Sequence, residues 1–494
     1  MNNDSPRLTW GCASGEVLDI KRWFVGVIMP DVRTPGGRHE RCTSLDKVDA
    51  LMTPPRSMSA VNDLFKKNTL ELNASYLKLD DGPRRSVSSR WFGPLEAHSV
   101  RTCVSSLAAT ALGAGALALP YAFSLTGIGL GLATMVFAGL VSALSLQILM
   151  VGARYTDMQS YAAVLELAVG SSWASFVLDL VLVVNGFGAL ICILIFEGDF
   201  IPSIMANPPA AFGIEGFPLP RDYAIMGAAL AVWPLTLSSN IAALRYVSLL
   251  VPVVLLTTVV LVVWDAPGLH TALREAGGRI AWWDFEPRRW LQALAIMVNA
   301  FANHMNAIPC VNQLSNPSIA RIVKATVYGN ALVFVLLSIL GVAGYMSWGA
   351  ATQGDFLLNY PDGRPEIWVC RVMLALLVYL VFPCACFPTA RSGAQLVLSA
   401  FGKGGHEVKP AAHAVSATVL VIVGTCAARN LTNVASVLGF LGGLLAASLM
   451  FWFPAVIYRL LLWRTQPRSF RGGVLFFLVL IASLCWASVA IKFV

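Results

Sequence analysis

Charge is scarce in this chain of 494 residues, since Asp, Glu, Lys and Arg make up 13% of it and hydrophobic residues 57%. A mean hydropathy of +0.68 excludes an ordinary soluble globular protein of this length. The ten cysteines form no CxxC pair, so we expect neither a metal site nor a disulfide framework. Paired intramembrane carboxylates, HExxH and nucleophile motifs are also missing, so we expect no cofactor and no enzyme.

The formal net charge of +8 raises the question of nucleic acid. The basic residues, however, lie in short segments between apolar runs rather than in one patch or stripe, which argues against a nucleic-acid partner. They are typical of residues that fix the orientation of a chain in a lipid bilayer.

Residues 1–95 differ sharply from the rest of the chain. They mix charges with Pro, Ser and Gly, show no sustained helical period and contain no cleavable signal pattern. We therefore expect a mostly disordered cytosolic tail at 1–95, followed by a membrane domain at 96–494.

The membrane domain contains eleven apolar windows of about 20 residues, the length that crosses a bilayer core. We expect an all-α, polytopic membrane protein with spans at 101–126, 128–152, 172–198, 223–240, 245–264, 290–315, 325–348, 367–390, 410–428, 432–458 and 473–491. The distribution of Lys and Arg predicts a cytosolic amino terminus and a carboxy terminus on the opposite side. The connection at 265–289 fits this orientation least, because it contains four arginines.

Two hydrophobic segments in this domain are interrupted near their middle. One contains Gly113 and Gly115, and the other contains Asn303, His304 and Pro309. They open two units of five spans each, at 101–264 and 290–458, with the extra helix 473–491 outside them. Because five is odd, the second unit enters the membrane from the opposite side, so we expect a five-plus-five inverted repeat with the substrate site of a secondary transporter at the two interruptions.

The first interruption consists of small residues. Glycine weakens a helix, and the half-helix that follows offers free N–H groups that attract a carboxylate. The same small residues also suit close packing between membrane helices, so both interpretations stay open. The candidate substrate-binding residues in this segment are Ala111, Gly113, Ala114, Gly115 and Ala116.

The second interruption carries a polar cluster of Asn303, His304 and Asn306 deep in a span. Intramembrane polar groups usually face an interior cavity, and carbonyls freed by the break accept hydrogen bonds from an ammonium group. His304 suits a proton relay or a structural hydrogen bond, and we favour the structural role. The candidate substrate-binding residues in this segment are Phe301, Ala302, Asn303, His304 and Met305.

A few polar residues remain in the other spans. Asn185 is a further candidate for the substrate site, or else an interhelical hydrogen-bond donor. Glu197 and Asp199 fall at the end of the third predicted span, where we expect them to be solvated. We expect no acidic residue at the midpoint of a core span, and hence none to neutralise a cationic substrate side chain.

Three segments together resemble the amino acid/auxin permease family, a eukaryotic branch of the amino acid, polyamine and organocation superfamily. They are Leu112 to Phe123 with Thr126-Gly127-Ile128, Phe301 to His304 continuing through Ile308-Pro309 to Asn316-Pro317-Ser318, and Gly439 to Gly442 continuing to Phe453-Pro454 and Tyr458. The resemblance covers roughly 97–492. It implies the leucine-transporter type of fold and transport of amino acids by alternating access.

In sodium-coupled relatives, the resemblance implies an ion between first-span carbonyls and a hydroxyl that shortly precedes a proline in span eight. The corresponding segment here, Tyr379-Leu380-Val381-Phe382-Pro383, has no such hydroxyl. This favours proton coupling or exchange over sodium coupling. The candidate ion-coupling positions are Ala108, Ala111, Val381 and Cys384, although Cys384 also suits a packing role.

We therefore expect a secondary active transporter with an amino acid as its substrate, and with protons as the favoured coupling ion. The alternative is a membrane amino-acid sensor that signals through the tail at 1–95 to a cytosolic partner. We expect the plasma membrane rather than a vacuolar or lysosomal membrane.

Overall fold

The computed structural model describes residues 99–491, except 210–212, 214, 238–244, 316, 361–363, 402–407, 432–433 and 464–467. The regular secondary structure of these residues is helical throughout, which confirms the all-α prediction. The predicted cytosolic tail lies outside the described residues.

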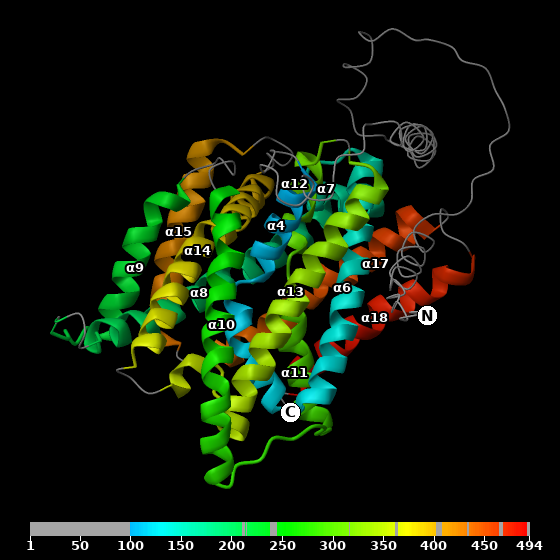
Figure 1. The fold of residues 1–494 in the computed structure, drawn as a ribbon. Helices are drawn as coiled ribbons and strands as arrows, with labels where there is room; N and C mark the ends of the chain where they lie inside the picture. The colour runs from blue at the N-terminus through cyan, green and yellow to red at the C-terminus, as the bar shows by residue number, and fades with distance from the viewer. Residues whose placement is uncertain are drawn as a thin grey trace, which may run out of the picture.

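Long helices run roughly alongside one another and form a bundle (Figure 1). The continuous ones are α6 (Ile128–Thr156), α8 (Ser172–Ala206), α9 (Arg221–Thr236), α10 (Arg245–Glu275), α13 (Ile319–Trp348), α14 (Pro365–Ala400), α15 (Pro410–Asn430) and α18 (Arg468–Ala490). The short α7 (Tyr161–Val169) precedes α8. Ser160 caps its first turn by accepting from the N–H of Ala163, and Gly170 ends it in a left-handed conformation with φ of 75°.

Within the described ranges, nine helices are long and apolar enough to cross a bilayer, and a bent pair supplies a tenth crossing. The predicted span at 223–240 corresponds to α9. Its 16 described residues reach only about 24 Å, less than a bilayer core of about 30 Å. The remainder of that predicted span, 238–240, lies outside the described residues.

Both predicted interruptions are present in the fold. The first unit begins with α4 (Val100–Ala111), the 3-10 turn η3 (Ala114–Ala118) and α5 (Leu119–Ser124), and the two halves of this span meet at 56°. The second unit begins with α11 (Pro287–Asn299), the 3-10 turn η6 (His304–Asn306) and α12 (Ala307–Gln313). The interrupted helices lie inside the bundle, whereas α18 lies at one edge and α9 and α15 at the opposite edge (Figure 1).

The predicted connection at 265–289 is shorter than expected, because α10 continues to Glu275. The remaining loop is bound to the start of α6, where the N–H of Gly129 donates to the carbonyl of Trp282 at 2.7 Å. Gly127 makes this contact sterically feasible. Its φ is +78°, and a Cβ atom there would lie 2.8 Å from the carbonyl oxygen of Ala281.

The tenth predicted span is helical but irregular. It begins with α16 (Val434–Phe440) and continues through π-helical turns η9 (Leu441–Ala446) and η10 (Ser448–Trp452), then α17 (Phe453–Ile457) and the π-helical turn η11 (Tyr458–Leu462). Such π-helical turns are rare in proteins, and those that do occur are often found at functional sites. Gly442 lets η9 approach α11 closely, because a Cβ atom there would clash with the carbonyl oxygen of Ala295. The span therefore packs directly against the second interrupted helix.

Candidate functional site at the two helix interruptions

A cavity of about 100 Å³ lies between the two interruptions. Five parts of the bundle form its wall, namely the first interruption, the second interruption, α8, α14 and the start of the tenth span. Its lining residues are Thr110, Ala111, Gly113, Gly115, Asn185, Ala189, Ile193, Asn299, Ala302, Met305, Asn306, Val381, Cys384, Ala385, Leu438 and Leu441. Segments nearly 200 residues apart in the sequence thus share one small space.

The first interruption separates two short helical runs. The N–H of Leu112 ends α4 by donating to the carbonyl of Ala108 at 2.8 Å, and η3 makes its first hydrogen bond only from the N–H of Ala116 to Gly113, at 3.1 Å. The N–H groups that precede Ala116 are therefore not used inside η3. Gly113 and Gly115 carry two of these groups and both line the cavity.

The two glycines differ in how much space surrounds them. A Cβ atom on Gly115 would lie 3.4 Å from the Cα of Ala300 and 3.5 Å from the Nδ2 of Asn299, both at the second interruption. A Cβ atom on Gly113 would meet only Val381, with its Cγ1 at 3.7 Å, which is ordinary contact. At Gly115 the backbone of the first interruption thus packs closely against the second.

At the second interruption, two of the polar side chains are bound to the surrounding helices. The Nδ2 of Asn303 donates to the Oδ1 of Asn330 on α13 at 2.9 Å, and Asn330 donates in turn to Ser142 on α6 at 3.3 Å. The Nε2 of His304 lies 3.0 Å from the hydroxyl of Ser145 on α6. Both side chains are buried outside the cavity lining, so these contacts favour the structural role for His304.

Other polar groups do reach the cavity. The Nδ2 of Asn306 donates to the hydroxyl of Thr110 at 2.9 Å and thereby joins the two interruptions. The Nδ2 of Asn185 donates to the sulfur of Met305 at 3.5 Å, and its Oδ1 is buried with no hydrogen-bond partner in the described part of the chain. An unpaired buried acceptor is costly unless a ligand completes it, so Asn185 is a strong candidate contact.

Eight of the candidate residues line the cavity, namely Ala111, Gly113, Gly115, Asn185, Ala302, Met305, Val381 and Cys384. Four others lie behind it. Ala116 is buried, Phe301 packs with its ring 3.2 Å from the Cβ position of Gly139, and Asn303 and His304 bind α13 and α6. Ala108 also stands behind the lining, and its carbonyl is used by Leu112. The side chain of Ala114 is outside the described part of the structure.

Several lining residues were not among the candidates: Thr110, Ala189, Ile193, Asn299, Asn306, Ala385, Leu438 and Leu441. Asn299 and Asn306 stand immediately on either side of the second break. Asn306 belongs to the polar cluster visible in the sequence, and a search for polar residues at helix ends would also have found Asn299.

The α14 wall of the cavity consists of Val381, Cys384 and Ala385. The thiol of Cys384 faces the carbonyl of Leu380 at 3.8 Å, so it contributes a weak donor at most. Val381 lies against Gly113, opposite the end of α4. This part of the wall therefore offers no hydroxyl to an ion beside the first interruption.

The structure corrects the expectation for acidic residues in the third span. Because α8 continues to Ala206, Glu197 is well inside the helix, and its side chain is 3% exposed rather than solvated. Asp179, which the sequence did not single out, is 7% exposed on the same helix and accepts from the hydroxyl of Ser392 at 2.8 Å. Asp199 forms an ion pair with Arg221 at 3.1 Å.

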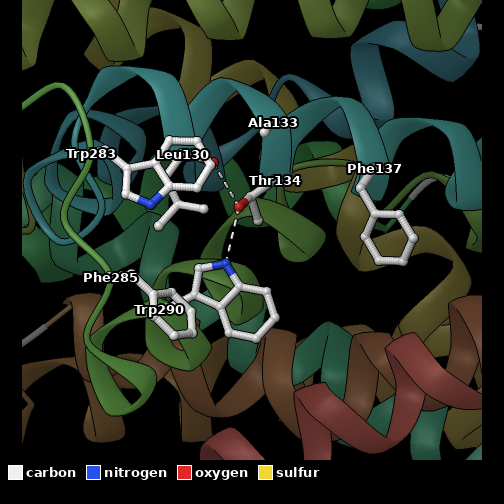
Figure 2. A pocket seen from close by; sticks show the side chains of 7 residues that line it. All are labelled: Leu130, Ala133, Thr134, Phe137, Trp283, Phe285 and Trp290. Atoms are coloured by element: carbon white, nitrogen blue, oxygen red, sulfur yellow. Dashed lines mark hydrogen bonds between the residues drawn. The ribbon is translucent and has the colours of Figure 1, made fainter.

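A second hollow of about 460 Å³ lies on the outside of α6 (Figure 2). It is lined mainly by apolar and aromatic side chains, including Trp283, Phe285 and Trp290. Two of its polar side chains are already bound, because the Nε1 of Trp290 donates to Thr134 at 3.1 Å and Thr134 donates to the carbonyl of Leu130 at 2.8 Å. The hollow is thus mainly apolar, and its lining suits an apolar chain better than a zwitterion.

The fold is that of the leucine-transporter type. A manganese transporter from Eremococcus coleocola is similar over 83% of this chain and 90% of its own, with a TM-score of 0.52 and 12% identity. A Na+-coupled sialic acid symporter is similar over 87% of this chain and 95% of its own, with a TM-score of 0.50 and 12% identity. At this identity, the likeness establishes the fold alone.

The sequence comparison defines the family. The family described as "Transmembrane amino acid transporter protein" matches residues 96–492, so the chain belongs to this family of membrane transporters. The chain is 28% identical to Vacuolar amino acid transporter 5 of Schizosaccharomyces pombe, over 74% of this chain and 86% of that protein. It is 26% identical to Putative sodium-coupled neutral amino acid transporter 11 of Bos taurus, over 76% of this chain and 80% of that protein.

A third relative is Putative amino acid transporter AAT1 of Toxoplasma gondii, which is 30% identical over 63% of this chain. The match spans 42% of the length of that relative. The protein is thus a multi-pass integral membrane protein of an amino-acid transporter family.

Proposed function

We propose that this chain is a secondary active transporter that binds an amino acid in the cavity between the two interruptions and moves it by alternating access. The observation that carries the proposal is that both interrupted helices line one cavity. Paired interruptions of this kind are typical of the substrate sites of secondary transporters. The cavity volume of about 100 Å³ is smaller than most ligand pockets, so the cavity must open further to admit a substrate.

The first interruption is the proposed site for the substrate carboxylate. Gly113 and Gly115 line the cavity and precede the first hydrogen bond of η3, so their N–H groups are available to an anion. The absence of side chains at both positions allows a carboxylate to approach the backbone.

The opposite wall is the proposed site for the substrate ammonium group. The buried Oδ1 of Asn185 has no partner among the described residues, and Ala302 at the second interruption also lines the cavity with its backbone carbonyl as a further candidate acceptor. Oxygen acceptors of this kind suit a positively charged donor, and hydrogen bonds to charged groups are stronger than those between neutral ones.

For the coupling ion, we propose protons or exchange rather than sodium. Support comes from the α14 wall, where Val381 lies beside Gly113 and neither Cys384 nor Ala385 supplies a hydroxyl. One relative is named as putatively sodium-coupled and another as vacuolar, so these names favour neither coupling ion nor membrane. Residence in the plasma membrane remains our prediction, and co-localisation of a fluorescent fusion with membrane markers tests it.

Uptake of radiolabelled amino acids into proteoliposomes tests the function. We expect at least one amino acid to accumulate, more strongly with an acidic exterior and equally in sodium and choline buffers. If no amino acid moves under any of these conditions, the proposal is wrong. Removal of residues 1–95 should leave the flux intact in a transporter, whereas a sensor that acts through this tail would keep ligand binding and lose its partner.

A further inference from the structure

Helix α8 carries a buried carboxyl group close to the cavity. Glu197 lies one helical turn beyond Ile193, which lines the cavity, and the series Asn185, Ala189 and Ile193 leads up to it at four-residue spacing. The side chain of Glu197 is 3% exposed, and its Oε1 has no hydrogen-bond partner among the described residues. The carboxyl group is therefore near the proposed substrate but outside the lining itself.

The packing around Glu197 closes it off from solvent. Gly198, the next residue, lies so close to α9 that a Cβ atom there would be 2.6 Å from Ile225. Tyr379 on α14 is near enough to Glu197 to interact with its carboxyl group electrostatically. The hydroxyl of Tyr379 donates to the carbonyl of Ala231 on α9 at 2.9 Å, so this hydroxyl proton is not available for a hydrogen bond to Glu197.

The charged side chains of α9 and of the first half of α14 bind other groups. On α9, Arg221 pairs with Asp199 at 3.1 Å, and Asp222 pairs with Arg429 of α15 at 2.8 Å. On α14, Arg371 donates to the hydroxyl of Ser203 at 2.6 Å and to the carbonyl of Tyr360 at 2.9 Å. Among the ion pairs of the described residues, none includes Glu197.

Asp355 is the other buried acid near this end of α8. It lies in the connection between α13 and α14, and its Oδ1 accepts from the N–H of Leu357 at 3.2 Å. Its charge does not compensate that of Glu197, because both groups are acids.

A buried carboxylate without a counter-ion is strongly disfavoured, whereas the neutral acid is tolerated. Glu197 can lose its proton only when water or an ion reaches it. In a transporter that works by alternating access, water reaches the adjacent cavity first from one side of the membrane and then from the other. The hydration of Glu197 then changes with each step. Ionisable groups in this position are typical of proton relays in membrane transporters.

We propose that Glu197 is the residue that binds and releases the coupled proton during amino-acid transport. This inference rests on the proposed function. On the acidic side, a hydronium ion donates one proton to the carboxylate, which makes Glu197 neutral as the cavity closes with the amino acid inside. On the other side, entering water accepts the same proton, and the carboxylate forms again. One proton thus crosses with each amino acid, and no other bond is made or broken.

Proteoliposomes of purified wild type, Glu197→Gln and Glu166→Gln test this inference. Glu166 is the matched control, because it is an exposed glutamate on the neighbouring α7. The measurements are amino-acid uptake driven by a pH gradient, proton influx with an internal pH dye, and exchange of labelled for unlabelled amino acid at equal pH. We expect Glu197→Gln to exchange the amino acid while it loses both gradient-driven uptake and proton influx. Glu166→Gln should match wild type in all three.

Glu197→Asp separates protonation from packing, since it keeps the carboxyl group and shortens the side chain. We expect it to retain proton influx with a shifted pH dependence. The inference is overturned if Glu197→Gln still moves protons with the amino acid, if Asp and Gln at this position fail equally in folded protein, or if wild type moves the amino acid without protons. Absence of any amino-acid flux in wild type would instead overturn the proposed function.

Discussion

Each of the two interruptions lies in the first span of a five-span unit of the predicted repeat, yet the two are built differently. The first is bent by 56° and consists of small residues whose N–H groups border the cavity. The second keeps its direction well enough for Pro287–Gln313 to form one span, and it carries large polar side chains. Two of these, Asn303 and His304, bind neighbouring helices instead of facing the cavity.

This difference indicates a division of labour. The first interruption supplies bare backbone, which suits a ligand carboxylate. At the second, the side chains of Asn303 and His304 hold the break in place against α13 and α6, and the residues on either side of them line the cavity. A polar side chain in a membrane helix can therefore either line a cavity or anchor its helix to a neighbouring one. A hydrogen-bond partner on another helix assigns it to the second role.

The largest effect is expected from Gly115→Val at the first interruption. A Cβ atom added at this position would lie 3.4 Å from the Cα of Ala300, so the branched side chain of valine would fill the space between the two breaks. We expect uptake to fall by roughly 100-fold or more, since small displacements in a binding site have effects of that size. Gly227→Val on α9 is the control, because a Cβ atom there has nothing within 4 Å and the residue lies outside the cavity lining. It should keep the uptake of wild type.

The next effect concerns pH and the loop that packs on the first interruption. The 3-10 turn η8 (Phe356–Asn359) contacts η3, and Asp355 precedes it. Burial, with a contribution from the charge of Asp199, raises the pKa of Asp355 from 3.8 to about 7. The folded protein thus holds the proton of Asp355 more tightly than the unfolded chain does. The resulting contribution to stability is fully present below pH 3.8 and is lost as the pH rises through about 7.

Between those limits, the loss amounts to at most about 4 kcal/mol. We expect the thermal stability of wild type to fall between pH 5 and pH 8 and that of Asp355→Asn to fall much less. Equal slopes for the two proteins would show that this carboxyl group does not control the loop.

Asn185→Ala tests the wall opposite the first interruption. If the Oδ1 of Asn185 accepts from the substrate ammonium, its removal costs about 1.5–3 kcal/mol, or roughly 10- to 100-fold in KM. The expected change is in KM for the transported amino acid, with thermal stability close to that of wild type. An unchanged KM would remove Asn185 from the site.

Asn330→Ala examines the scaffold behind the second interruption. The substitution removes the partner of Asn303 and also the bond to Ser142, without touching a lining residue. We expect unfolding in detergent at a lower temperature, with a loss of about 1–2 kcal/mol, and an unaltered KM. A raised KM in otherwise stable protein would assign the Asn303 network to the substrate site.

The smallest effect is expected for sodium. Because the α14 wall beside Gly113 is Val381, replacement of sodium by choline should leave the initial rate of uptake unchanged at fixed pH. A rate that rises with sodium would require an ion site other than the one expected beside Val381.

Much of the fold follows from the sequence, because lipid forces helices to be about 20 apolar residues long. The two breaks were predicted at the correct residues, since glycines at 113 and 115 and the polar cluster at 303–306 serve helices in lipid poorly. The end of α8 was predicted wrongly. The sequence predicts that Glu197 and Asp199 are solvated at the end of the third span, but neighbouring helices bury the first and Arg221 pairs with the second.

The site was predictable in part. Backbone features such as Gly113 and Gly115 could be identified, because glycine exerts its effect locally. The sequence favours a structural role for His304, but it does not identify the partners of Asn303 and His304. These partners, Asn330 and Ser145, are distant in sequence, and only tertiary packing brings them near. The lining residues Leu438 and Leu441 also depend on how the tenth span packs against α8 and α11.

The most direct test of the shared site is equilibrium binding of the transported amino acid to purified wild type, Gly115→Val and Asn330→Ala. Wild type and Asn330→Ala should bind with similar Kd, and Gly115→Val should not bind while remaining folded. Normal binding by Gly115→Val, or loss of binding by folded Asn330→Ala, would contradict the assignment of the substrate to the cavity between the two interruptions.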